Sequence, residues 1–433
     1  MRNGLVFDSG VCTKMSIVAT ETDSSKARLH GQAAPILLIP CEITSEIFQH
    51  CLPEDGFPRP SVKCAPTQLS RVCSTWHNLA IRTPRLWPKI FLCTSPQDGG
   101  DPKRSLTAIS HVKALEVWMT RATPFLLSVH LRYPTLPRLP TSEFQLGKLP
   151  PVFCVIVDNA ARWKDINLSL PQDYLSFAWS LTQQNASNLK SIYLEDTSIP
   201  MFGHPLESGS DVVLNADTAE SLSTLSVRAS ILYTSRKPAP FVGLRTLSLK
   251  HSSPRNCLHL LKYCPVLESL NLHFFELAEA HILHLTSPIL LPQLRDFHLS
   301  HTGYGEHGIS FFPESLCGEV GALLDNFELP NLREFYLWVT VGSYMRYYHP
   351  ELPSDYLSRL IIRSNCSLTT LELRNPHMET RSIVECLQLS PDLKDLGIPA
   401  DEELERQVTQ IMPGLQSLRI FSDRQDENKV SIS

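Results

Sequence analysis

The chain contains no long apolar run, no paired cysteines and no leader-like segment, and these shortages limit where it works. Its longest apolar runs, such as residues 152–157, are far too short to cross a membrane. The first 30 residues carry Asp8, Glu21 and Asp23 without a sustained apolar block, which argues against a secretory signal. The 12 cysteines are scattered and form no C-x-x-C pair, so reduced thiols are expected. We therefore expect a cytoplasmic or nuclear protein, or both, with no membrane partner.

Strong positive charge and glycine are also scarce. The formal net charge of the 433 residues is −5, and no run of Lys or Arg reaches five residues. A nucleic-acid partner is therefore not expected. There are only 18 glycines, whereas the 33 prolines lie between apolar-periodic segments, which favours folded structure over a low-complexity chain. The hydrophobic content of 42% supports a sizeable core.

Catalytic and metal-binding motifs are missing too. No G-x-S-x-G, H-E-x-x-H or phosphate-loop motif is present, and residues 303–308 spell G-x-G-x-x-G without a helix opening at the third glycine. Five histidines have suggestive spacings, but no cysteine or carboxylate completes a ligand set: His281, His284, His298, His301 and His307. We predict no catalytic residues, no metal and no cofactor. A hydrolase on this chain would require a pocket with a convergent nucleophile and base.

The stretch from residue 39 to residue 87 contains two helical patterns. The first begins with Pro40 at its first position, and Ile43, Ile47 and Cys51 then recur every four residues. The second places six apolar residues on one face at spacings of three and four: Leu69, Val72, Cys73, Trp76, Leu79 and Ala80. Ser74 is a candidate cap for a separate third helix. The stretch closes with Leu86 and Trp87.

Three helices of this size cannot bury so much apolar surface among themselves. The Ile stripe and Trp76 must therefore face another surface. One possibility is that they dock on the rest of this chain. The other is that they meet a separate subunit.

The order of residues in this stretch favours the second possibility. Ile-Pro-x-Glu-Ile-x-x-Glu-Ile-Phe, then Leu-x-x-Val-Cys-x-x-Trp-x-x-Leu-Ala, then Leu-Trp, resembles the F-box, in particular the F-box-like variant of fungal proteins. A proline-rich insertion at 53–66 replaces the tight turn of many F-boxes. The resemblance implies binding to the Skp adaptor of a cullin–RING ubiquitin ligase. Carried over by position, the adaptor-facing residues are Pro40, Ile43, Ile47, Leu69, Val72, Cys73 and Trp76.

The second half of the chain repeats the pattern apolar-x-x-apolar-x-apolar. Ten copies occur, at spacings of 22 to 38 residues: 163–168, 189–194, 222–227, 244–249, 267–272, 294–299, 332–337, 368–373, 393–398 and 415–420. Helical patterns lie between many of them, often stopped by a proline, as at Pro265, Pro391 and Pro413. Chance in a leucine-rich chain is the alternative, but ten copies followed by helix-like gaps argue against it.

The pattern resembles leucine-rich repeats, whose β-α units stack because one unit cannot bury its own apolar face. The asparagine that regular repeats carry after the strand is largely replaced, for example by Thr197 and Ser252. The predicted fold class is therefore α+β: an N-terminal three-helix F-box-like domain followed by an irregular leucine-rich-repeat α/β solenoid with a parallel sheet. The predicted domains are 1–34 (flexible arm), 35–92 (F-box-like), 93–150 (linker, helix and first strand), 151–421 (solenoid) and 422–433 (flexible tail).

The positions that alternate with the repeat's apolar residues should face solvent on the inner side of the solenoid. Aromatic residues and arginine on such a face suit a protein partner. The predicted target-binding residues are Tyr193, Asn271, His298, Tyr336, Trp338, Glu372 and Arg374. The alternative is that a neighbouring loop or the C-terminal tail covers Tyr336 and Trp338.

Together these patterns predict a substrate-recognition adaptor of a Skp–cullin–F-box ubiquitin ligase. The F-box would bind the Skp adaptor, and through it a cullin, while the repeats bind an unidentified target protein. The alternative function is a repeat scaffold that acts outside any ligase, with its F-box-like helices serving only as an N-terminal cap.

Overall fold

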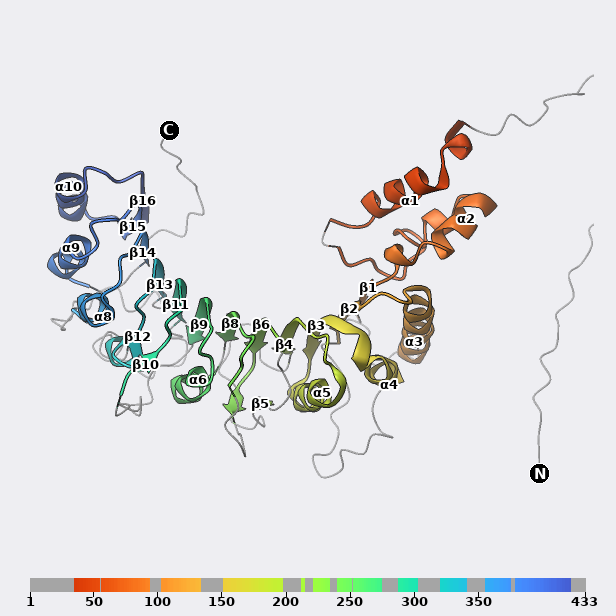
Figure 1. Ribbon diagram of the computed structural model, residues 1–433, viewed down its shortest axis with the longest axis horizontal. Helices are drawn as coiled ribbons and strands as arrows, with labels where there is room; N and C mark the ends of the chain where they lie inside the picture. Colours follow the sequence, from red (N-terminus) through yellow and green to blue (C-terminus); the bar gives the residue numbers. More distant parts are fainter. Residues whose placement is uncertain are drawn as a thin grey trace, which may run out of the picture.

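The computed structural model describes residues 35–54, 56–93, 103–133, 151–197, 212–214, 221–233, 240–250, 252–274, 287–302, 320–340, 355–374 and 378–421. The predicted arm and tail lie outside these ranges. Figure 1 shows that the described residues form an arc. One long sheet lines its inner side, helices cover its outer side, and a helical group stands at its N-terminal end.

The long sheet has 12 strands, all parallel and in chain order. All ten predicted repeat copies contribute strands to it, so the predicted solenoid is confirmed. The sheet also contains β1, which was not predicted, and β2, which corresponds to a strand expected before the repeats. The strands are β1 (Lys89–Cys93), β2 (Leu127–Arg132), β3 (Trp163–Leu170), β4 (Ser191–Asp196), β6 (Thr224–Arg228), β8 (Thr246–Lys250), β9 (Ser269–Phe274), β11 (Asp296–Thr302), β13 (Glu334–Thr340), β14 (Thr370–Arg374), β15 (Asp395–Pro399) and β16 (Ser417–Phe421).

The repeat pattern forms strands because its last two apolar residues, two positions apart, point to the same face of a strand. In β9 these residues are Leu270 and Leu272, both fully buried. Burial of one such leucine stabilises the fold by about 1.5–3 kcal/mol. The residues between the core positions point to the inner side of the sheet, where most of them are partly exposed.

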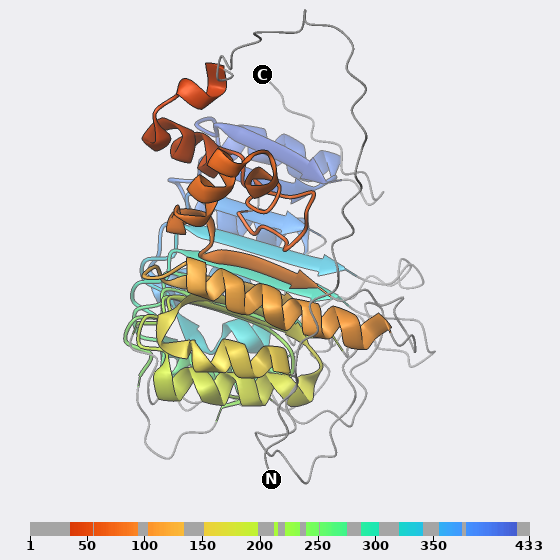
Figure 2. The same ribbon diagram turned by 90° about the vertical axis from the view of Figure 1, so that its right-hand side faces the viewer.

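The helices lie on the outer face of the sheet (Figures 1 and 2). Two small parallel sheets also occur outside the long one, β5 (Val212–Leu214) with β7 (Ile231–Tyr233) and β10 (Ile289–Leu290) with β12 (Phe327–Glu328). Asp401 caps α10 by accepting a hydrogen bond from the Leu404 N–H at 3.0 Å. The helices are α3 (Lys103–Arg121), α4 (Pro151–Asp158), α5 (Gln172–Asn185), α6 (Pro254–Leu261), α8 (Tyr356–Ser364), α9 (Thr380–Gln388) and α10 (Glu402–Ile411).

The N-terminal group differs in detail from the predicted helices. It consists of η1 (Pro35–Leu38), α1 (Cys41–His50), η2 (Leu69–Arg71), α2 (Ser74–Ile81) and η3 (Pro84–Leu86). Pro40 is the residue before α1 rather than its first residue, and its carbonyl accepts the N–H of Thr44. The helical pattern that begins at Leu69 is divided into η2 and a separate α2, because Cys73 is extended and its thiol caps α2 by accepting the Trp76 N–H at 3.5 Å. The cap is thus one residue before Ser74.

The same structural unit joins the N-terminal helices to the sheet and recurs inside the solenoid. In α2–η3–β1, the indole N–H of Trp87 donates to the carbonyl of Ala80 at 2.8 Å. In α4, η5 (Ala160–Arg162) and β3, the indole N–H of Trp163 donates to the carbonyl of Ile156 at 3.1 Å. Both tryptophans are buried at the entry to a strand. The helical group is therefore built into the end of the solenoid.

The proline-rich insertion at 53–66 covers the N-terminal edge of the sheet. The Phe91 N–H in β1 donates to the carbonyl of Pro58 at 2.9 Å. The guanidinium of Arg59 lies 4.8 Å from the centre of the Phe91 ring, and Lys89 lies over Phe57. An open edge strand is a template for unwanted pairing, and this loop occupies it.

Candidate protein-interaction sites

The N-terminal group exposes a set of large apolar side chains, here called the N-terminal ridge. Ile43 and Ile47 on α1 are 53% and 41% exposed, and Val72 is 58% exposed. The ridge continues into η1 and consists of Ile36, Leu37, Leu38, Ile43, Ile47 and Val72. Several large apolar side chains left exposed on one small helical group are typical of a binding site for another protein.

Packing inside the helical group explains why the ridge faces outward. α1 turns Thr44 and Phe48 toward the interior, and Phe48 is fully buried. The Phe48 ring meets the edge of Trp76 at 4.9 Å between ring centres. Ile43 and Ile47 each precede one of these buried residues by one position, which rotates them about 100° around the helix and out of the core.

The other predicted adaptor-facing residues support the ridge from inside or border it. Leu69 is buried, and Trp76 is half-buried against the core. Cys73 is half-buried as the α2 cap, and Pro40 is exposed. The exposed apolar side chains of η1 were not predicted to bind a partner. Three consecutive apolar residues directly before the Ile-Pro pair could have indicated them.

On the inner face of the sheet, the predicted target-binding residues occupy two rows across the strands. The first, the middle row, contains Tyr193, Ser226, Ser248, Asn271, His298, Tyr336, Glu372, Gly397 and Arg419 in register. The second, the basic row, lies two positions further along and contains Glu195, Arg228, Lys250, His273, Ser300, Trp338 and Arg374. The structure thus places all seven predicted residues on one face.

Glu372 is the centre of the C-terminal end of this face. Its side chain is only 2% exposed, so the solvent exposure predicted for this position is wrong. Arg374 donates to it at 2.7 Å, and Arg419 lies 2.9 Å away. The Trp338 indole N–H donates to the same carboxylate at 3.1 Å. A buried carboxylate is tolerated only when charge and hydrogen bonds compensate it, as here.

Aromatic rings complete this end of the face. The Arg374 guanidinium lies between the rings of Trp338 and Phe421, at 4.1 and 4.2 Å from their centres. Trp338 nevertheless keeps 41% of its surface exposed. Tyr336 stacks on His298, with 4.1 Å between ring centres, and burial together with its bond to Glu334 raises the pKa of Tyr336 to about 12.

Gly397 is required beside Glu372. A Cβ atom at this position would lie 2.7 Å from the Phe421 ring and 2.9 Å from Cγ of Glu372. Only glycine lets these two side chains pack over β15. Gly397, Arg419 and Phe421 were not among the predicted residues, because their role depends on register across three strands.

Positive charge gathers in the basic row. Arg228 pairs with Glu195 at 2.8 Å, and Ser169 donates to the other oxygen of that carboxylate at 2.6 Å. Burial, together with the neighbouring Arg228 charge, lowers the pKa of Lys250. Burial first, and then the charges of Lys250 and Arg228, lower the pKa of His273 to about 4. His273 is therefore neutral at pH 7.

We expect this histidine to make the fold sensitive to acid. Between pH 6.5 and about 4 the unfolded chain binds a proton at His273 that the folded ring excludes, so stability falls as the pH drops through this window. Urea unfolding of the wild-type protein and His273→Gln at several pH values measures the effect. The difference between the two proteins should change across the window, and a constant difference would contradict the expectation.

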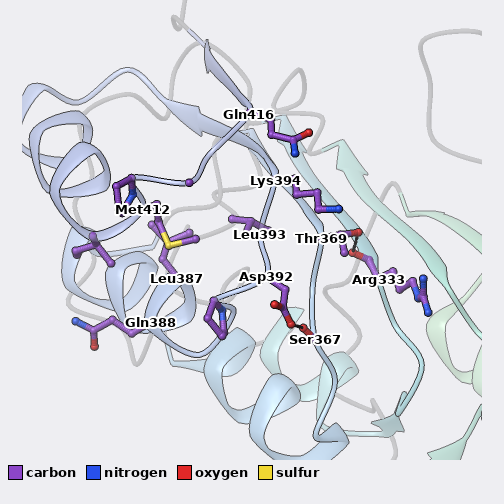
Figure 3. Close-up of a pocket in the computed structure, with 14 residues that line it drawn as sticks. Arg333, Ser367, Thr369, Leu387, Gln388, Asp392, Leu393, Lys394, Met412 and Gln416 are labelled. Atoms are coloured by element: carbon purple, nitrogen blue, oxygen red, sulfur yellow. Dashed lines mark hydrogen bonds between the residues drawn. The ribbon is translucent and has the colours of Figure 1, made fainter.

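A cleft of about 850 Å³ opens where the last strands begin (Figure 3). Polar side chains on its rim include Arg333, Lys394 and Gln416, and Met412 lies deeper. Ser367 donates to Asp392 at 2.6 Å, but no histidine lines the cleft.

Some of the candidate nucleotide-binding and metal-binding positions lie outside the described residues: the G-x-G-x-x-G at 303–308, His281, His284 and His307. Within the described ranges, no three His, Cys, Asp or Glu side chains converge as metal ligands. Of the remaining histidines with suggestive spacing, His298 stacks on Tyr336, and His301 is buried. Among the described helices, none has the length and apolarity to span a membrane.

Comparison with known proteins returns no match to any protein-family model and none to the curated proteins. Among solved structures, the chain is similar to one in the crystal structure of the Rad7 and Elc1 complex in yeast. That similarity covers 85% of this chain and 95% of the other, at 12% identity and a TM-score of 0.35.

Proposed function

We propose that this protein is a substrate-recognition adaptor of a Skp–cullin–F-box ubiquitin ligase. The observation that carries the proposal is the exposure of Ile43, Ile47 and Val72 at positions that match the F-box pattern. Exposing several large apolar side chains to water is unfavourable unless a partner covers them. The Skp adaptor, and through it a cullin, is the partner that the pattern implies.

The second part of the proposal is that the inner face of the solenoid holds the target. Trp338 and Arg374 combine an exposed aromatic ring with a positioned guanidinium, a pairing that is common in protein–protein hot spots. The N-terminal group stands at one end of the arc whose inner side the sheet lines (Figure 1). Such a chain contributes proximity and orientation, while the chemistry belongs to other subunits.

One observation favours the alternative, a repeat scaffold outside any ligase. The insertion at 53–66 covers the edge strand β1, which is what an N-terminal cap would do. A cap alone, however, has no use for isoleucines that face away from the sheet. The ligase role requires Ile43 and Ile47 to bind the Skp adaptor, whereas the scaffold role does not.

We expect Ile43→Ala/Ile47→Ala to weaken binding to the Skp adaptor by about 30- to 1,000-fold, because each truncation removes about 1–2 kcal/mol of apolar burial. Isothermal titration of the full-length protein with purified adaptor measures the change. Ile362→Ala is the matched control, since Ile362 is 64% exposed on α8, away from the ridge. Failure of the intact protein to bind the adaptor, or equal binding by both variants, would reject the ligase role.

A further inference from the structure

The inner face repeats one arrangement twice, a carboxylate held between cations and donors from neighbouring strands. Glu195 accepts from Arg228 and Ser169. Glu372 accepts from Trp338 and Arg374 and also pairs with Arg419. Glu195 balances the charge of Arg228, and Glu372 balances one of the two positive charges of Arg374 and Arg419. The face therefore has a regular way of holding an acidic side chain.

Lys250 lies between these two sites without such a carboxylate. It stands in register with Arg228 on one side and His273 on the other, and its side chain is half-buried. Within the described part of the chain, no acidic oxygen lies within 4.0 Å of its ammonium group, and Glu195 is committed to Arg228. A charged amine that is partly removed from water and lacks a close anion favours an anion from outside.

We infer that Lys250 holds an acidic side chain, aspartate or glutamate, of the target segment bound along the inner face. This inference rests on the proposed role of that face in target binding. Asn271 stands diagonally across from Lys250, in the neighbouring strand β9. At that separation its amide lies within reach of the same carboxylate and offers it a second donor.

The charges favour a carboxylate over a phosphate group. Glu195 already balances Arg228, and His273 is neutral at pH 7, so Lys250 contributes one uncompensated positive charge. A single carboxylate matches that charge. A phosphate dianion would add a second negative charge near Glu195, whose field reaches Lys250.

Chemical footprinting of the full-length protein tests the inference directly. The probes are three pools of capped decapeptides, random in Ala, Ser and Tyr, with a central Glu, Gln or phosphoserine. Mass spectrometry follows the rate at which an added acetylating reagent modifies Lys250 in the presence of each peptide pool at millimolar concentration. We expect the Glu pool to slow acetylation of Lys250 at least threefold and the Gln pool to have no effect. Exposed Lys190 in the same protein should react at an unchanged rate.

A matched pair of variants completes the test. Lys250→Met should weaken binding of the fluorescent Glu pool about tenfold, because it removes a charge-assisted hydrogen bond, whereas Lys190→Met changes the net charge equally and should have no effect. Equal protection by the Gln pool, stronger protection by phosphoserine, or no protection at all would each overturn the inference. Adaptor binding is measured separately. If the protein binds the adaptor but the Glu pool does not slow acetylation of Lys250, only this inference is rejected. If the Glu pool slows acetylation but the adaptor does not bind, only the ligase role is rejected.

Discussion

Replacing Arg374 and Arg419 together by methionine should lower the free energy of unfolding by about 3–5 kcal/mol. These two guanidinium groups are the charges that compensate Glu372, which is 2% exposed. Methionine keeps the apolar bulk over Glu372 and between the rings of Trp338 and Phe421, so the carboxylate stays covered but unpaired. Removing the partners of a buried charge costs far more than losing an exposed ion pair.

Urea unfolding followed by circular dichroism measures this change. The informative control adds Glu372→Gln to the double variant, because the amide removes the buried charge while keeping its shape. The triple variant should recover most of the lost stability. As a surface control, Arg381→Met removes an exposed pair with Glu385 and should cost under about 1 kcal/mol. If the triple variant is as unstable as the double variant, lost packing rather than an unpaired charge explains the effect.

The solenoid could be predicted from the sequence because its signal is local. In each repeat, two apolar positions that face the same side predict a strand, as Leu270 and Leu272 do in β9. The ten copies predict the same structure independently of one another. Strand β1 was not predicted, although Trp87, Ile90 and Leu92 fit the repeat pattern, because these residues were assigned to the end of the F-box-like stretch. Its place in the sheet depends on the loop at Pro58 and on β2.

The candidate sites were only partly predictable, for a related reason. Alternation along one strand shows that Glu372 and Trp338 belong to the inner face, but it does not show which residues meet. The partner of Glu372 on β16 is Arg419, and the contact also needs Gly397 on the strand between them. In the helical group, the helix period does not reveal that Cys73 leaves the helix to cap α2, or that Leu69 is buried while Val72 is exposed.

Trp87→Ala should lower the free energy of unfolding by about 3–5 kcal/mol and loosen the N-terminal group from the solenoid. Trp87 is 1% exposed, and its ring meets the edge of Trp118 on α3 at 4.7 Å between centres. The Arg121 guanidinium lies 4.4 Å from the centre of the ring, and the indole N–H satisfies the carbonyl of Ala80. The side chain thus joins α2, β1 and α3, and alanine leaves a large cavity at their junction. Hydrogen exchange should report the change as faster exchange in α1 and α2.

Two further variants separate the contributions of Trp87. Trp87→Phe keeps most of the apolar contact but leaves the Ala80 carbonyl without its indole donor, so it should cost about 1–3 kcal/mol. Trp338→Ala removes an equally large ring that is 41% exposed, and its effect on stability should be smaller than that of Trp87→Ala. Equal destabilisation by Trp87→Ala and Trp338→Ala would contradict the role of Trp87 as the junction. So would unchanged exchange in α1 and α2, because the loss would then not be transmitted to the ridge that we propose binds the adaptor.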